Sequence, residues 1–238
     1  MSVDSLEHNL RLLSEYRPEL YCRIKGMSPS PFIGMEISRS GCSIPLWIKR
    51  GGRRALHSTI DPVREGVRFF QAHKAEGFLV FFGMGGGYHI EPFLSGRSIS
   101  SLMIVEPVQS EFLSYLSFFD AAPLITDPRV EFIVGHEAEE CAERIFSEYF
   151  PAVSGDFTVI PFRPLVELHT EYYQELSQCI QNLLDHTASD YTVQTTFGKR
   201  WFSNAVRNLP MVEKTSWMLP PSRKVLITGA GPSLEDQV

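Results

Sequence analysis

Four short apolar runs, separated by segments with helical patterns, constrain the fold of this chain more than any other feature. The runs are Phe78–Phe82, Leu102–Val105, Val130–Val134 and Phe157–Ile160. Continuous apolar runs of this length are typical of strands that are buried on both faces of a sheet. The intervening segments 88–95, Ser110–Phe119 and Glu137–Phe150 are interpreted as helices. Strands that alternate with helices in this way predict an α/β fold, with a parallel sheet and helical crossovers.

This alternation defines a Rossmann-like domain over residues 61–165. Asp61 and Pro62 favour the start of a helix that ends near His73, because aspartate caps a helix and proline suits its first position. The preceding residues 1–60 combine an amphipathic helix over 1–16 with short strands over 31–56. A small β-rich segment is therefore expected before the main sheet.

The residues after the sheet predict a helical linker region over 166–222. Apolar residues at helical spacing indicate one helix over Tyr172–Leu184 and a second over about Tyr191–Asn208. Prolines break the helical pattern further on, at Pro210, Pro220 and Pro221. Residues 223–238 then predict a new strand and a second glycine turn, which would open a further domain.

Composition excludes several classes of partner and site. The net charge of −6 and the lack of a basic run disfavour nucleic acid and anionic membranes. No signal peptide or membrane-spanning segment is recognisable, so a soluble, cytoplasmic protein is expected. The cysteines and histidines show no metal-ligand spacing, and no metal is predicted.

The first glycine turn, Gly83-Met-Gly85-Gly-Gly87, follows the first buried strand and is a candidate cofactor-binding site. Glu106 ends the second strand, 19 residues past Gly87, where an acid can bind the ribose hydroxyls of a nucleoside. Tyr88 stands where the dinucleotide fingerprint requires its last glycine. The alternative is a turn whose glycines serve only helix packing, so nucleoside binding at Gly83, Gly85, Gly87 and Glu106 is a hypothesis.

These residues resemble the class I S-adenosylmethionine methyltransferases, and the spermidine synthases in particular, which implies a methyltransferase-like topology. The stretch Asp127–Gly135 strengthens the resemblance. Three departures count against an enzyme of this kind: the two residues before Gly83 are phenylalanines, His136 follows Gly135, and Pro161-Phe162 follows the fourth strand, where an acid is expected. An enzyme that uses S-adenosylmethionine or its decarboxylated form is the alternative function.

The second glycine turn carries a more specific motif, Gly229-Ala-Gly231-Pro232-Ser233-Leu. Ser233 can cap a helix whose backbone amides would face a phosphate. This motif resembles the opening of the motility accessory factor (Maf) family of bacterial flagellin glycosyltransferases, and it is shared with 6-hydroxymethylpterin diphosphokinases. A pterin diphosphokinase-like protein is thus a second alternative, which rests on this motif alone.

Further segments agree with the Maf family in their order along the chain. Leu56–Phe70 resembles its His-Ser…Asp-Pro segment, and the first glycine turn with Val105-Glu106-Pro107 follows. Phe197–Pro210 is similar to the helix with paired asparagines that precedes the catalytic domain of the family. The resemblance covers about residues 50–238.

The resemblance implies a function for the whole protein and a lesser role for this chain. The family is taken to move a nonulosonic acid, such as pseudaminic or legionaminic acid, from its CMP-activated form to Ser or Thr of flagellin. This chain would be an N-terminal fragment, cut just inside a transferase domain at 223–238 and inactive alone; the alternative is a naturally short protein. The implied partners are flagellin, a nucleotide-sugar donor and a second copy of the chain in a homo-oligomer. No cofactor is required. Gly229, Gly231, Pro232 and Ser233 would bind nucleotide, and the first turn a CMP-sugar or an S-adenosylmethionine-like nucleoside.

Glu106 distinguishes a ligand pocket from simple packing. Burying an unpaired carboxylate costs several kcal/mol, so the acid needs partners. Three glycines at Gly-x-Gly-x-Gly spacing exceed what helix packing requires, and we therefore expect Glu106 to face an open, solvated cleft. In a degenerate domain the amides of the glycine turn or Arg129 would take the place of the ligand.

Overall fold

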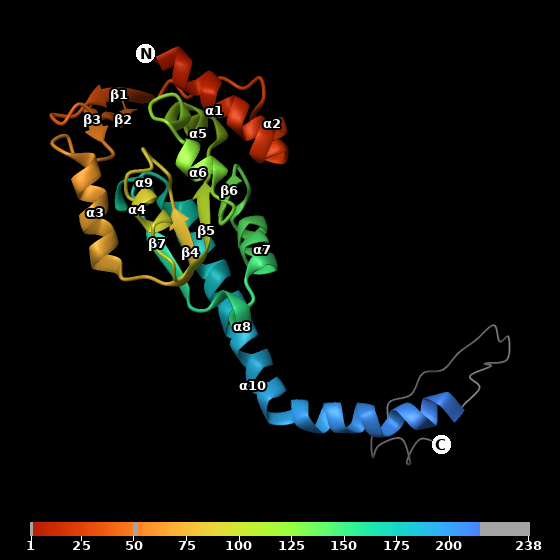
Figure 1. Ribbon diagram of the computed structural model, residues 1–238. Helices are drawn as coiled ribbons and strands as arrows, with labels where there is room; N and C mark the ends of the chain where they lie inside the picture. Colours follow the sequence, from red (N-terminus) through yellow and green to blue (C-terminus); the bar gives the residue numbers. More distant parts are fainter. Residues whose placement is uncertain (1, 50–51, 215–238) are drawn as a thin grey trace. The chain divides into compact units, whose positions relative to one another are not determined.

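A computed structural model describes residues 2–49 and 52–214 of the chain (Figure 1). Two compact units are distinguished, residues 1–185 and 186–238, and each is described by itself. The second glycine turn, with Gly229, Gly231, Pro232 and Ser233, lies outside the described residues, as do Pro220 and Pro221.

A four-stranded parallel sheet forms the centre of the first unit. Its strands are β4 (Gly77–Phe82), β5 (Ile99–Glu106), β6 (Val130–Val134) and β7 (Phe157–Pro161), in the order β6-β5-β4-β7. In β4, Val80 pairs with Met103 of β5 on one side and with Val159 of β7 on the other. The α/β fold with a Rossmann-like parallel sheet is thus confirmed.

Alternating side chains of the strands bury two separate cores, one on each face of the sheet. In β4, Leu79 and Phe81 belong to the first core, whereas Phe78, Val80 and Phe82 belong to the second. This division follows from the two-residue period of a strand and explains why all of β4 is buried.

The helices between the strands are shorter than the sequence pattern predicts. Helix α5 covers Gln109–Leu116, and α7 covers Ala138–Glu148. The remaining short helices are α4 (Glu91–Leu94), α6 (Ala122–Thr126), α8 (Pro151–Ser154) and α9 (Arg163–Val166). Figure 1 shows α5 and α6 close to α1. Buried residues of α5 and α6 belong to the first core, whereas those of α10 in the first unit belong to the second, so these helices cover opposite faces of the sheet.

The N-terminal part contains the small β-rich segment that the sequence predicts. Helices α1 (Ser2–Tyr16) and α2 (Pro18–Ile24) precede an antiparallel sheet of β1 (Ile33–Ile37), β2 (Ser43–Lys49) and β3 (Gly52–Ala55). Helix α3 (Pro62–His73) follows, and the Asp61 side chain accepts a hydrogen bond from the Arg64 backbone N–H at 2.9 Å. The prediction of an Asp61 cap is confirmed.

The chain from Thr170 to Lys214 is a single helix, α10, and not the two predicted helices. The segment between the two apolar patterns, 185–190, is polar but contains no glycine or proline, so nothing in it ends a helix. Pro210 was also expected to end the helix, but it lies inside α10. Within the first unit, Tyr173, Leu176 and Ile180 of this helix are buried in the second core.

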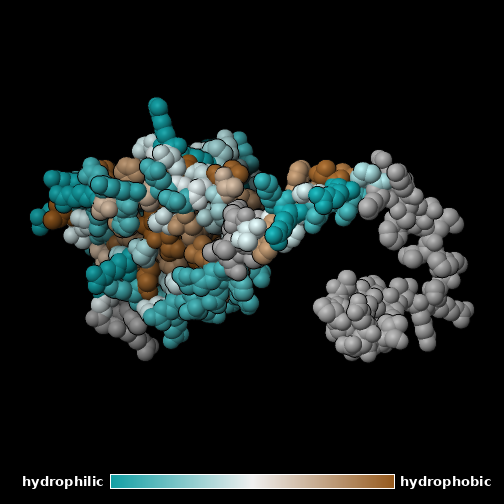
Figure 2. All heavy atoms as spheres, turned by 90° about the horizontal axis from the view of Figure 1, so that it is seen from below, coloured by the Kyte–Doolittle hydropathy of each residue, from teal (hydrophilic) through white to brown (hydrophobic). Residues whose placement is uncertain are grey.

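In the second unit α10 carries exposed apolar side chains. These are Phe197, Trp201, Phe202, Val206 and Leu209. Figure 2 shows apolar and polar atoms on different sides of this part of the helix. Among the described residues, no helix is both long enough and apolar enough to cross a membrane.

Candidate functional site

The first glycine turn lies where open α/β sheets bind their ligands. It follows β4, whose neighbours β5 and β7 lie on its two sides, so the strand order reverses at this point. Gly83, Gly85 and Gly87 have φ angles of +98°, +51° and +74°. These left-handed conformations disfavour any side chain, so the turn itself requires glycine.

Glu106, at the end of β5, lies against this turn. One carboxyl oxygen, Oε1, accepts a hydrogen bond from the backbone N–H of Met84, and the side chain is fully buried. Burial raises the pKa of Glu106 to about 8, and Glu111 adds to the rise, although the amides of Met84 and Gly85 oppose it. At neutral pH the acid is therefore mostly protonated, which avoids the cost of a buried charge.

The open, solvated cleft that we expected at Glu106 is not found, because the side chain is 0% exposed. The amides of the glycine turn take the role that a ligand would have. Arg129, the other expected partner, instead donates to Asp127 and to the backbone carbonyls of Leu94 and Gly96. The expectation was wrong because the polar space at the strand ends is filled by side chains from elsewhere in the chain.

His57, His89 and Phe162 fill the space beside the turn. The Phe162 ring stacks on His89 with a centroid distance of 4.0 Å and on His57 with 4.7 Å. The backbone N–H of Gly86 donates to Nε2 of His57 at 2.9 Å, and Nε2 of His89 lies 3.2 Å from the Gly83 carbonyl oxygen. The three rings thus form a buried stack, which we call the aromatic plug.

The glycines of the turn are in close contact with the residues around them. A Cβ atom on Gly83 would lie 2.5 Å from Cδ1 of Leu165, and one on Gly85 would lie 3.0 Å from both His57 and Phe162. On Gly87 it would lie 2.9 Å from Phe119. These contacts favour the packing alternative for the glycines, and ligand binding at Gly83, Gly85, Gly87 and Glu106 stays a prediction.

Both histidines of the plug are neutral at physiological pH. Burial lowers the pKa of His57, although Glu65 partly opposes the shift, and burial also lowers the pKa of His89 well below its ordinary value. Because Nε2 of His57 accepts from Gly86, its proton lies on Nδ1, 3.4 Å from Oε2 of Glu65. The plug is thus fixed by specific hydrogen bonds as well as by packing.

Sequence reasoning missed the plug. His57 belongs to the His-Ser segment, and Phe162 follows the fourth strand, where an acid was expected. The substitution of phenylalanine for an acid was the signal that could have revealed a filled site. No group of three or more His, Cys, Asp or Glu side chains in the described part of the chain could hold a metal ion.

The fold and this site define a class of protein: a Rossmann-like domain whose ligand crevice is occupied by its own side chains. A family profile described as "Glycosyltransferase Maf N-terminal domain" matches residues 53–188. This match covers more than half of the chain, and the chain belongs to the Maf glycosyltransferase N-terminal domain family. The matched range contains the glycine turn, Glu106 and the whole aromatic plug.

Two similar proteins come from Treponema pallidum (strain Nichols), and both are described only as uncharacterized. One is 29% identical over 119 residues, which cover 49% of this chain and 57% of the relative. The other is 24% identical over 160 residues, which cover 64% of this chain and 53% of the relative. The chain therefore spans about half the length of the curated relatives it matches. No solved structure matches it.

Proposed function

We propose that this chain is the N-terminal, non-catalytic part of a bacterial flagellin glycosyltransferase. In the whole protein, another region would move a CMP-activated nonulosonic acid to Ser or Thr of flagellin. Family membership supports a role in glycosyl transfer. The assignment of flagellin and of a CMP-activated nonulosonic acid as substrates follows from the resemblance of the sequence motifs. The non-catalytic role follows from the crevice at the glycine turn, which side chains of the chain itself fill.

The aromatic plug is the observation that carries the non-catalytic assignment. A nucleotide at the switch point of this sheet needs space beside the glycine turn and an ionised acid for its ribose. Here His57 and Phe162 occupy that space, and Glu106 is buried and mostly protonated at neutral pH. Residues 53–188 would thus serve in flagellin docking, oligomerisation or presentation of the acceptor, in the cytoplasm and without a cofactor.

Binding of the nucleotide-sugar donor is assigned to Gly229, Gly231, Pro232 and Ser233. This assignment rests on the sequence motif alone. A pterin diphosphokinase-like role has the same basis, and no feature of the described residues favours it.

Mass spectrometry of flagellin tests the proposed role. An in-frame deletion of the codons for residues 53–188 in the source cells should remove the glycan mass from flagellin peptides. Re-expression of the undeleted gene should restore it. Flagellin that keeps its glycan mass in the deletion strain would overturn the proposal.

The catalytic status of the chain itself is tested in vitro. The purified chain is incubated with unmodified flagellin and a CMP-activated nonulosonic acid, and the flagellin mass is measured. We expect no mass increase. Transfer by this chain alone would show that the non-catalytic assignment is wrong while leaving the family role intact.

An S-adenosylmethionine-dependent enzyme is the second candidate, favoured by the sheet order and by Glu106 at the end of β5. Calorimetric titration with S-adenosylmethionine and S-adenosylhomocysteine separates the two candidates. We expect no binding at millimolar ligand, because the plug occupies the crevice. Binding that is lost in the Glu106→Gln variant would favour the second candidate.

A further inference from the structure

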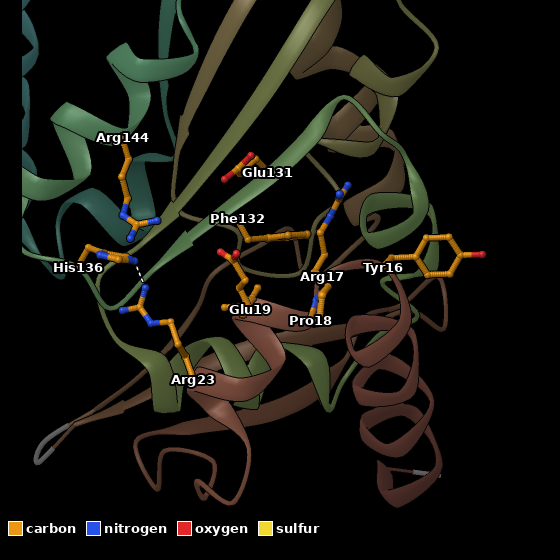
Figure 3. Close-up of a pocket in the computed structure, with 10 residues that line it drawn as sticks. Tyr16, Arg17, Pro18, Glu19, Arg23, Glu131, Phe132, His136 and Arg144 are labelled. Carbon is orange, nitrogen blue, oxygen red and sulfur yellow. Dashed lines mark hydrogen bonds between the residues drawn. The ribbon is translucent and has the colours of Figure 1, made fainter.

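A cavity lies against the edge strand β6, at the opposite end of the sheet order from β7. Its volume is about 280 Å³, close to the lower limit for small-molecule sites. Side chains from the α1–α2 junction, from α2, from β6 and from α7 surround it (Figure 3). We call it the basic pocket, because Arg17, Arg23 and Arg144 all line it.

We propose that the basic pocket binds a small hydroxyl-bearing acid, such as a sugar phosphate or a sugar carboxylate. The inference concerns a different face of the domain from the glycine turn, and it does not depend on the proposed transferase role. Three features carry it: arginines that are held in place, carboxylates beside them, and an open strand edge.

The arginines are held in place by the protein and keep donors for a ligand. Nη2 of Arg17 donates to the backbone carbonyls of Asp127 and Val130, each at 2.7 Å, while its Nη1 has no hydrogen-bond partner among the described residues. Arg144 donates through Nε to Glu140 at 3.3 Å. Guanidinium groups bind phosphate and carboxylate through paired N–H donors, and arginines that are already ordered lose less entropy when they do so.

His136 connects the other two arginines along one wall. Arg23 can only donate, so Nε2 of His136 accepts its hydrogen bond, drawn as the dashed line in Figure 3. The proton of the ring is then on Nδ1, which lies 2.8 Å from Oε1 of Glu140, the same oxygen that Arg144 contacts. Burial, with help from Arg23 and Arg144, lowers the pKa of His136 and keeps it neutral. Along this wall, each side chain from Arg23 through His136 and Glu140 to Arg144 therefore contacts the next.

Two carboxylates, Glu19 and Glu131, share the pocket with the arginines. A simple inorganic anion would gain little from them. Carboxylate oxygens accept hydrogen bonds from hydroxyl groups, so they suit a ligand that carries hydroxyls next to its acidic group. Burial raises the pKa of Glu131, although Arg17 and Arg144 oppose the shift.

The open edge of β6 supplies main-chain groups as well. Leu102 donates to the Arg129 carbonyl and Gly135 donates to the Glu106 carbonyl, so alternate residues of β6 face β5. Phe132 falls between them, and its N–H and C=O point to the outer edge, where none of the described strands pairs with β6. These groups can bind a polar ligand in the pocket.

Calorimetric titration of the chain with four probes tests this proposal. The probes are glucose 6-phosphate, glucuronate, inorganic phosphate and glucose. We expect binding of glucose 6-phosphate or glucuronate with a Kd in the millimolar range, weaker binding of phosphate and none of glucose. The tighter of the two sugar acids identifies the acidic group that the arginines prefer.

Matched variants locate the site. Arg144→Gln and Arg23→Gln each remove a guanidinium from the pocket, and each should weaken binding roughly tenfold, as expected for one charge-assisted contact. Arg68→Gln removes an exposed arginine from α3, which does not line the pocket, and should leave binding unchanged. Circular dichroism confirms that each variant is folded.

Three outcomes would overturn the proposal. The first is the absence of binding for both sugar acids at about 10 mM, well above the Kd expected of a weak site. The second is binding that neither pocket variant weakens. The third is glucose or inorganic phosphate binding as tightly as the sugar acids, because the site would then not require both hydroxyls and an acid.

Discussion

At the scale of single residues, Glu106 links the stability of the domain to pH. The acid is fully buried, and burial raises its pKa to about 8 in the folded chain. In the unfolded chain it ionises near the ordinary value of 4.5. The folded state therefore holds a proton that the unfolded state has lost, over the whole interval between these values. Stability is greatest below the lower pKa and falls as the pH rises toward the upper one.

Glu106→Gln should remove this dependence. Glutamine keeps an acceptor for the Met84 amide but cannot ionise, so the variant should gain stability relative to the original chain as the pH rises. The expected gain is about 1.4 kcal/mol per pH unit between pH 5 and 8, as an upper limit. Urea denaturation at several pH values measures it. The exposed Glu143→Gln is the control and should show no such trend. A constant difference across this range would show that Glu106 is ionised in the folded chain.

Substitution of Gly83 tests how closely other residues pack against the glycine turn. Gly83→Ala introduces a Cβ that overlaps Leu165, at a residue with φ of +98°. Gly41→Ala places the same group at φ of +86°, where nothing lies within 4 Å. Both variants strain the backbone, so their difference measures the packing alone. We expect Gly83→Ala to lower the free energy of unfolding by about 1–3 kcal/mol more than Gly41→Ala does. Equal losses in urea denaturation would mean that the turn has room for a ligand.

At the scale of elements, α3 connects the start of the domain to the aromatic plug. Its first turn contains Glu65, which faces Nδ1 of His57 and accepts a hydrogen bond from the Ser58 amide at 2.9 Å. The orientation of the plug therefore depends on where α3 begins, and Asp61 determines that position by capping the helix.

Asp61→Ala should lower the free energy of unfolding by about 1 kcal/mol, since it leaves the Arg64 amide without its cap. Asp61→Asn keeps a capping oxygen and is expected to stay within a few tenths of a kcal/mol of the original chain. Thermal or urea denaturation of both variants makes the comparison. If the asparagine variant loses as much as the alanine variant, the charge of Asp61 matters and the cap does not.

At the scale of the whole molecule, all the described residues of both cores lie within residues 1–185. The two clusters of buried apolar residues, with the partly buried residues packed against them, end at Leu184. Three buried residues of α10, Tyr173, Leu176 and Ile180, complete the second core. The first unit should therefore fold without the residues that follow it.

A truncated chain of residues 1–185 should unfold in one cooperative transition, with a midpoint within about 4 °C of the corresponding transition of the full chain. A chain of residues 1–168 is the matched control. It loses the three core residues of α10, each worth about 2–5 kcal/mol, which together exceed the stability of many domains. Circular dichroism during heating distinguishes the two. Similar transitions in both truncations would mean that α10 does not stabilise the sheet.

Local patterns in the sequence were sufficient for the order and type of most elements. Val130–Val134 was predicted at its observed limits, as were the Asp61 cap and the helix to His73. Apolar runs and capping residues act over a few positions, so they can be recognised without knowledge of the fold. The same local rules failed at α10, because polar residues interrupt an apolar face without ending a helix.

The glycine turn and Glu106 were located from the sequence, but only the tertiary structure decided what surrounds them. The chain brings His57, from before α3, and Phe162, from after β7, against the same turn, and these residues are 105 positions apart. Side-chain packing between such distant segments determines whether a crevice is open, and no local pattern records it. The basic pocket has the same origin, since His136 and Glu140 connect Arg23 to Arg144. The sequence determined which groups are present and the elements that carry them, whereas packing determined which of them face one another.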